Sequence, residues 1–99
     1  MTQQLKQELK SMIGPAAWHN LLPHAARDSI VLVNSGLDLA EVGVAVATDN
    51  VSSVQRWISE ALITKPTVEQ MTDWERDRSR QFQTLIVQPY VLIQSLTDD

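Results

Sequence analysis

The apolar residues of the N-terminal segment recur every three or four positions, which is the period of an α-helix. This stripe is formed by Leu5, Leu9, Met12 and Ile13, while Lys6, Gln7 and Lys10 lie off it. An amphipathic helix is therefore predicted over residues 3–13, and Gly14 is expected to end it.

A second short helix is predicted to follow directly. Pro15 suits a first helical turn, because that turn does not need its missing N–H, and Trp18 and Leu21 would form the apolar face. A proline further along cannot donate the next helical hydrogen bond. A break is therefore predicted at Leu22-Pro23.

Two segments are rich in β-branched and other apolar residues, as strands are. Residues 29–33 end at the turn signal Asn34-Ser35-Gly36 and are predicted to be a strand buried on both faces. Residues 82–95 are the stronger strand signal, interrupted by Pro89. Since proline donates no hydrogen bond to a sheet, Pro89 is predicted to mark a bulge, an edge or a turn between two strands.

Residues 37–48 fit two patterns. Asp38 and Glu41 have the spacing of a helix N-cap and its capping-box partner. The same segment alternates three valines with small residues, which is typical of a strand. The cap and the alanines favour the helix.

Two further helices are predicted from caps and apolar stripes. The first covers residues 51–62 and begins after Asp49-Asn50, with Asp49 as a candidate N-cap. Its apolar face is formed by Val51, Val54, Trp57, Ile58, Ala61 and Leu62. Thr67 and Gln70 have capping-box spacing, which predicts a helix that continues through Trp74.

The order of these elements predicts an α+β fold and not a repeated βαβ unit. Only the first strand, at 29–33, is followed by a long helical segment that leads to another strand. The helices are expected to pack on a short β-sheet built from the strands near 29–33 and 82–95. The 99 residues suit a single globular domain over residues 1–99, with residues 1–3 and 97–99 frayed.

Composition excludes several classes of function. The chain has no cysteine, so disulfides, thiolate metal sites and thiol nucleophiles are excluded. Its three glycines are far apart and no serine lies in a Gly-x-Ser-x-Gly motif, so no phosphate loop or hydrolase elbow is predicted. The net charge of −4 argues against nucleic-acid binding. We predict no cofactor, no metal site and no catalytic residue.

The cellular location is an expectation of the same kind. The longest apolar runs are too short to cross a bilayer. The first residues lack the apolar run of an export signal, so a cytoplasmic location is expected.

Some polar residues have two interpretations. His19 and His24 could form a metal site together with Asp28, but Pro23 disturbs the helical spacing. Histidines on the surface, or behind a site and not in contact with it, are the preferred interpretation. Asp38 and Glu41 could be paired carboxylates for acid–base chemistry, although a helix cap accounts for both.

The tryptophans and two glutamines also need a reason. Trp57, like Trp18 and Trp74, is interpreted as a core residue in preference to part of a ligand cage. Gln88 and Gln94 interrupt apolar strands, and a buried amide is costly unless its hydrogen bonds are satisfied. Each is therefore a structural amide or an outward-facing residue, or Gln88 and Tyr90 are presented to a ligand or partner.

Five segments together resemble a bacterial family of uncharacterised proteins, domain of unknown function 2288. They are Leu-Leu-Pro-His at 21–24, Leu-Asp-Leu-Ala-Glu-Val-Gly-Val-Ala at 37–45, Val-x-x-Trp-Ile at 54–58, Lys-Pro-Thr at 65–67 and Ile-Val-Gln-Pro-Tyr-Val-Leu-Ile-Gln at 86–94. The resemblance implies a small bacterial cytosolic protein and lends no activity or cofactor. It marks as family motif positions Pro23-His24, Asp38, Glu41, Trp57 and Gln88-Pro89-Tyr90.

Three hypotheses for function follow. The first is a non-enzymatic interaction module, homo-oligomeric or an adaptor for another protein, whose C-terminal strands offer an edge to a second chain. The second is a small-molecule binder or enzyme, with one pocket formed by His24, Asp38, Glu41, Gln88 and Tyr90. The third is a winged-helix-like nucleic-acid binder, suggested by helices followed by a two-stranded ribbon and opposed by the acidic charge.

Overall fold

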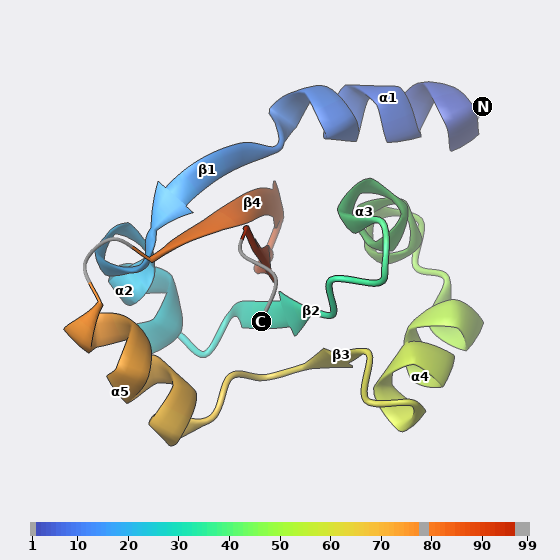
Figure 1. Ribbon diagram of the computed structural model, residues 1–99. Coiled ribbons are helices and arrows are strands. Elements are labelled where there is room, and N and C mark those ends of the chain that lie inside the picture. Colours follow the sequence, from blue (N-terminus) through green and yellow to red (C-terminus); the bar gives the residue numbers. More distant parts are fainter. Residues whose placement is uncertain (1, 78–79, 97–99) are drawn as a thin grey trace.

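A five-stranded mixed β-sheet forms the centre of the molecule and separates two groups of helices (Figure 1). This computed structural model describes residues 2–77 and 80–96. The described helices are α1 (Thr2–Met12), α2 (Trp18–Ala26), α3 (Leu39–Ala47), α4 (Val51–Ser59) and α5 (Val68–Arg76). The described strands are β1 (Gly14–Ala17), β2 (Ile30–Val33), β3 (Ile63–Thr64), β4 (Gln81–Val87) and β5 (Tyr90–Ser95). The predicted α+β class is confirmed.

The predicted strands form the inner part of the sheet. Its strand order is β1-β4-β5-β2-β3, with β2 parallel to β5 and the other neighbouring strands antiparallel. The hairpin of β4 and β5 turns at Gln88–Pro89, where the peptide bond is cis, and Val87 pairs with Tyr90. Pro89 therefore marks a turn, one of the three outcomes that the sequence predicts.

The two edge strands are short, and the sequence pattern does not predict them. Pro15 lies in β1, and α2 begins only at Trp18, so the prediction of a helix starting at Pro15 is wrong. An edge strand tolerates proline because the missing N–H can face away from the sheet. The pairing of β1 with β4 joins segments more than sixty residues apart, which local spacing cannot reveal.

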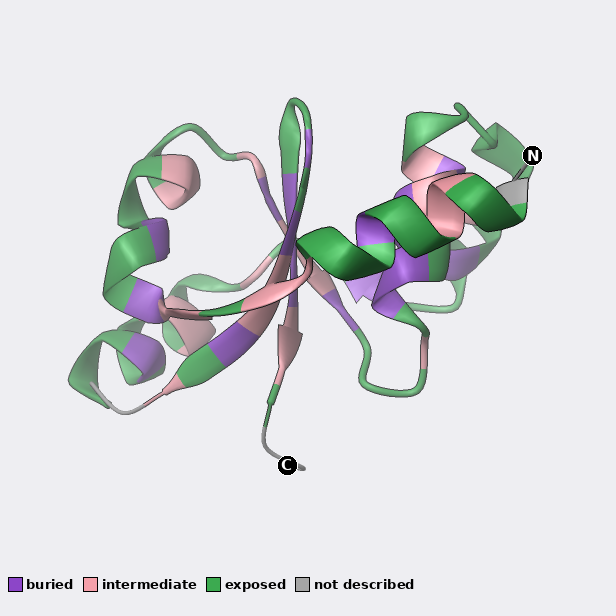
Figure 2. Cartoon of the chain, turned by 90° about the horizontal axis from the view of Figure 1, so that it is seen from above, coloured by how far each residue is buried: buried purple, intermediate pink, exposed green. Residues whose placement is uncertain are grey.

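Side chains that alternate along the inner strands form a separate core on each face of the sheet. Figure 2 shows buried residues along the strands and on the helices to either side of them. On one face, Leu85 of β4 packs with α1, α3 and α4, and Trp57 belongs to this core. On the other face, Phe82 packs against Trp18 of α2 and Trp74 of α5, with ring centroids 6.2 Å and 4.8 Å away. All three tryptophans are buried, which confirms their interpretation as core residues.

The ambiguous segment 37–48 contains the helix α3. Its cap is Asp38, whose Oδ1 accepts a hydrogen bond from the Ala40 N–H at 3.0 Å. The small residues that made the segment look strand-like let α3 lie close to the sheet. A Cβ atom on Gly43 would be 2.6 Å from Cδ2 of Leu85, so only glycine fits there without a shift.

The helix α2 continues through Pro23, so the predicted break at Leu22-Pro23 is wrong. A proline inside a helix costs about 3 kcal/mol, because it removes one hydrogen bond and crowds the carbonyl four residues earlier. That carbonyl belongs to His19, and both residues are exposed, so the loss falls on the solvent side of the helix. Trp18 and Leu21 on the buried side hold the helix to the sheet.

The helix α4 ends at Ser59, three residues earlier than predicted. Ala61 adopts a left-handed conformation with φ of 58°, and the Leu62 N–H donates to the Trp57 carbonyl at 2.8 Å. This conformation and this hydrogen bond are those of a Schellman motif, which usually contains glycine at the left-handed position. The sequence has alanine there, so the usual signal for a helix end is missing.

The structure also corrects predictions about where other helices begin. Asp49 is not the cap of α4: it has φ of 59° at the end of α3, and Asn50 caps α4 by accepting from the Ser53 N–H. Residues 2 and 3, predicted to fray, belong to α1. The other predicted frayed residues, 1 and 97–99, lie outside the described part of the chain.

Candidate functional site

The structure spreads the predicted site residues over several surfaces instead of one pocket. His24 is on α2, and the sheet separates it from α3, where Asp38 caps the N-terminus and Glu41 occupies the first turn (Figure 1). Gln88 is exposed at the hairpin turn. The pocket expected from His24, Asp38, Glu41, Gln88 and Tyr90 therefore does not form, because the central sheet lies between its members.

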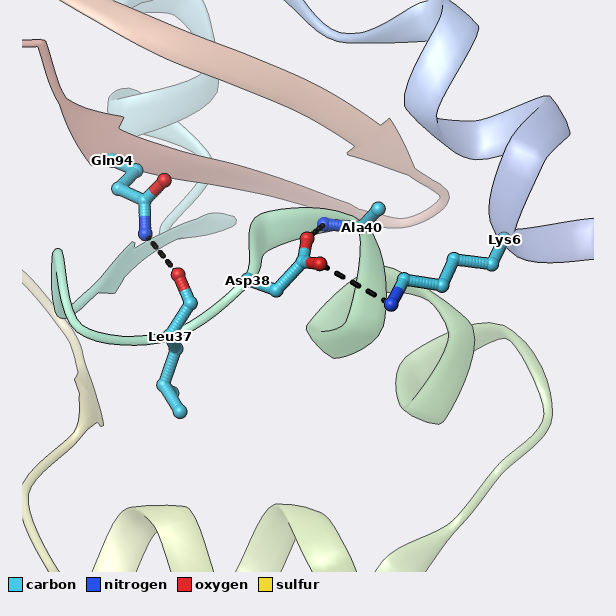
Figure 3. Close-up of polar contacts among 5 residues, drawn as sticks. All are labelled: Lys6, Leu37, Asp38, Ala40 and Gln94. Atoms are coloured by element: carbon cyan, nitrogen blue, oxygen red, sulfur yellow. Dashed lines mark hydrogen bonds and ion pairs between the residues drawn. The ribbon is translucent and has the colours of Figure 1, made fainter. Parts of the chain in front are cut away.

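Asp38 has a structural role (Figure 3). Besides accepting from the Ala40 N–H, its carboxylate lies 3.2 Å from the Nζ atom of Lys6 on α1. Burial raises the pKa of Asp38, but the hydrogen bonds and charge of Lys6 and the backbone N–H groups at the start of α3 outweigh it. The net effect is a pKa below the ordinary value, which suits a charged cap and not a general acid.

The two glutamines of the C-terminal strands differ in role. Gln94 is half-buried, and its Nε2 atom donates to the carbonyl oxygen of Leu37 at 2.7 Å (Figure 3). The same atom donates to the carbonyl oxygen of Asn34 at 2.9 Å. It is a structural amide that ties β5 to the loop between β2 and α3. Gln88 is exposed, which matches an outward-facing residue and removes the cost of burying its amide.

Glu41 and Trp57 border a hollow of about 320 Å³ between α1, α3 and α4. Its cationic side chains are Lys6, which pairs with Asp38, and Arg56, whose Nε lies 4.0 Å from Glu60. Trp57 is only 7% exposed, so it offers little surface to a ligand. Among the described residues that line the hollow, these pairings leave no unpaired cation to attract an anionic ligand.

An apolar groove of about 490 Å³ suits a binding partner. It lies between the sheet and the helices α3 and α4. Its floor includes Val31 of β2 and Leu92 of β5, and its walls are formed by α3, α4 and β3. Charged groups at its border are Asp49, in the α3–α4 connection, and Lys65, which follows β3.

Large apolar side chains on the border of this groove face solvent. Val51 and Ile58 of α4 are 53% and 57% exposed, and Tyr90 of β5 is 45% exposed. The arrangement offers apolar contact and little acid–base chemistry. Among the described residues, no group of three His, Asp or Glu side chains is placed to hold a metal ion.

The sequence singled out Tyr90 but not the rest of this groove. Val51 and Ile58 belong to the apolar face of the predicted helix 51–62, and that pattern predicts burial. Of that face, Trp57 reaches the core. Periodicity identifies an apolar face, but it cannot say whether the fold supplies enough surface to cover it.

Comparison with known proteins identifies the family. The model of the family described as "Protein of unknown function (DUF2288)" matches residues 4–95. The chain belongs to the DUF2288 family. A solved relative of this DUF2288 protein is PA1075 from Pseudomonas aeruginosa, determined by NMR in solution, with 27% sequence identity and a TM-score of 0.81. The match covers 96% of this chain and 87% of that one. A search of curated proteins found no match.

The described helices of this DUF2288 protein include none with the length and apolar character needed to cross a membrane.

Proposed function

We propose that the protein is a non-enzymatic interaction module that binds another protein chain through its apolar groove. The observation that carries this proposal is the exposure of Val51, Ile58 and Tyr90 around a groove with an apolar floor. Contiguous apolar surface of this kind costs free energy in water and is typical of binding surfaces. A cytoplasmic location is part of the proposal.

A protein partner fits this surface better than a small molecule does. A small apolar ligand would cover the floor, but it would leave the side chains on the border facing water. A partner chain covers both floor and border, as in interfaces with an apolar centre. A partner chain would therefore bury the exposed part of Ile58, whereas a small ligand on the floor would not.

The other two hypotheses lose the features that suggested them. The small-molecule or enzyme hypothesis needs His24, Asp38, Glu41, Gln88 and Tyr90 in one place, and they lie on separate surfaces. The winged-helix hypothesis needs a free two-stranded ribbon. The hairpin of β4 and β5 instead lies between β1 and β2, with helices over both faces.

Site-specific photo-crosslinking in bacterial cells tests the proposal. The photoreactive residue benzoylphenylalanine replaces Ile58 at the groove or, as a matched control, Val68 of α5. Val68 is also apolar and is 75% exposed, but it is not among the groove residues. Both replacements are on exposed helical surface, so both variants should fold.

We expect a covalent adduct with a protein from position 58 and little or none from position 68. Mass spectrometry of the adduct identifies the partner. Protein adducts of equal yield from both positions, or none from position 58, would refute the proposal. An adduct of only a small molecule at position 58 would also refute it, in favour of a ligand-binding groove.

A further inference from the structure

The groove and the helix beside it form a surface that is complementary to itself. Resting on the proposed function, we infer that the chain that occupies the groove is a second copy of this protein, related by a two-fold axis. The α4 helix of each copy lies against the groove of the other.

The shape of the surface supports this arrangement. Val51, Val54 and Ile58 follow one another at spacings of three and four along α4, so they form one apolar ridge. The ridge stands next to the hollow between α3, α4 and the sheet. In a two-fold dimer both copies use the same patch. The ridge of each copy can therefore occupy the hollow of the other.

The charges at the groove support it as well. Asp49 precedes α4 and Lys65 follows β3, and these two connections lie apart in Figure 1. A two-fold axis that crosses the groove at a right angle exchanges its two ends, and this orientation brings Asp49 of each copy toward Lys65 of the other. The chain has a net charge of −4, yet this patch has one charge of each sign and does not repel its own copy.

The sheet edges offer a poorer route to association. Pro15 interrupts the donors of β1 at one edge, and β3 has only two residues at the other. Both features discourage pairing with a second sheet. The predicted use of the C-terminal strands as a pairing edge is wrong, because β4 and β5 lie inside the sheet.

The groove would form the centre of the interface. Fifteen residues line it. A standard interface uses roughly 20–30 residues, or roughly 800 Å², on each side. The groove by itself is smaller than that, so solvent-facing residues next to α4 must supply the rest of the interface.

Sedimentation equilibrium of the full chain, from micromolar to hundreds of micromolar protein, tests the inference. The wild type is expected to rise from 11.1 kDa toward twice that mass with concentration. Ile58→Glu places an unpaired charge in the interface and is expected to raise the dissociation constant by about 100-fold or more. Val68→Glu adds the same charge on α5 and should associate like the wild type. Circular dichroism checks that each variant is folded.

A charge exchange tests the two-fold geometry. Asp49→Lys and Lys65→Asp are each expected to weaken the dimer about tenfold, and the double variant should restore it. Lys65 also pairs with Asp28 of its own chain, with Nζ and Oδ2 2.6 Å apart. Asp28→Asn is the control, because it removes that internal pair without changing Asp49 or Lys65.

The outcomes separate this inference from the proposed function. A wild type that stays at 11.1 kDa, with a different protein crosslinked at position 58, refutes the dimer and leaves the interaction module standing. A monomer with no protein crosslink refutes both. A dimer that Ile58→Glu does not weaken, or that the double exchange does not restore, refutes the arrangement inferred here.

Discussion

Asp38 provides a direct test of whether a predicted site residue acts as a helix cap. Its Oδ1 atom accepts from the Ala40 N–H at 3.0 Å, and its Oδ2 atom lies 3.2 Å from Nζ of Lys6. Asp38→Asn keeps an oxygen for the cap and removes the charge. Asp38→Ala removes both.

The expected losses of stability differ between these variants. Losing the cap costs about 1 kcal/mol, within a range of about 0.5–2 kcal/mol. The ion pair joins side chains that are 38% and 42% exposed, so solvent screening limits it to about 0.2–1 kcal/mol. We therefore expect a loss of less than about 1 kcal/mol for Asp38→Asn and about 1–2 kcal/mol for Asp38→Ala.

The loss in Asp38→Asn should depend on pH. The pKa of Asp38 is lowered in the folded protein, so its charge contributes stability above the unfolded pKa of about 3.9. That contribution is lost as the pH falls through the folded pKa. The difference between wild type and Asp38→Asn should therefore be greatest at neutral pH and shrink below about pH 4.

Urea unfolding followed by tryptophan fluorescence measures these differences, since the three tryptophans are buried in the two cores. Each comparison is made at one protein concentration, because association with a second chain would add to apparent stability. Equal losses in Asp38→Asn and Asp38→Ala would show that the cap oxygen contributes nothing. A difference that widens at low pH would refute the assigned direction of the pKa.

Three further predictions concern backbone and packing. Ala61→Gly should stabilise the protein by about 0.5–1 kcal/mol in the same urea assay, because glycine adopts the left-handed conformation at the end of α4 without strain; a loss would contradict this. Gly43→Ala should lower the free energy of unfolding by about 1 kcal/mol, since crowding of Leu85 exceeds the gain in helix propensity. Gly43→Val should cost more, and a stabilising Gly43→Ala would show that the core yields freely. Gln94→Leu removes the side-chain donor from the carbonyls of Asn34, which keeps the Leu37 N–H, and of Leu37, and should cost about 1–3 kcal/mol, while Gln88→Leu at the exposed turn should leave the unfolding midpoint nearly unchanged.

The candidate site shows how far periodicity reaches. The pattern around Trp57 correctly predicts an apolar helix face, and Trp57 is buried. The same pattern predicts that Val51 and Ile58 are buried, yet both face solvent beside the groove. Their exposure depends on how much of the sheet α3 and α4 cover, and this is set by contacts between distant segments.

By itself, the sequence determined what short-range physical chemistry controls. Capping residues at Asp38 and Thr67, the β-branched strand near 29–33 and the proline turn at Pro89 all appear in the structure. Each depends on neighbours within a few residues, whose hydrogen bonds and dihedral preferences hold in any fold.

Only the tertiary structure decided the edges, the helix ends and the binding surface. β1 forms because β4 pairs with it, α2 passes through Pro23 because its buried side is held to the sheet, and Ala61 takes a conformation that its residue type disfavours. In each case the energy of long-range packing exceeds a local preference of about 1–3 kcal/mol. The groove exists for the same reason, since two helices close together in sequence cover only part of a sheet assembled from distant strands.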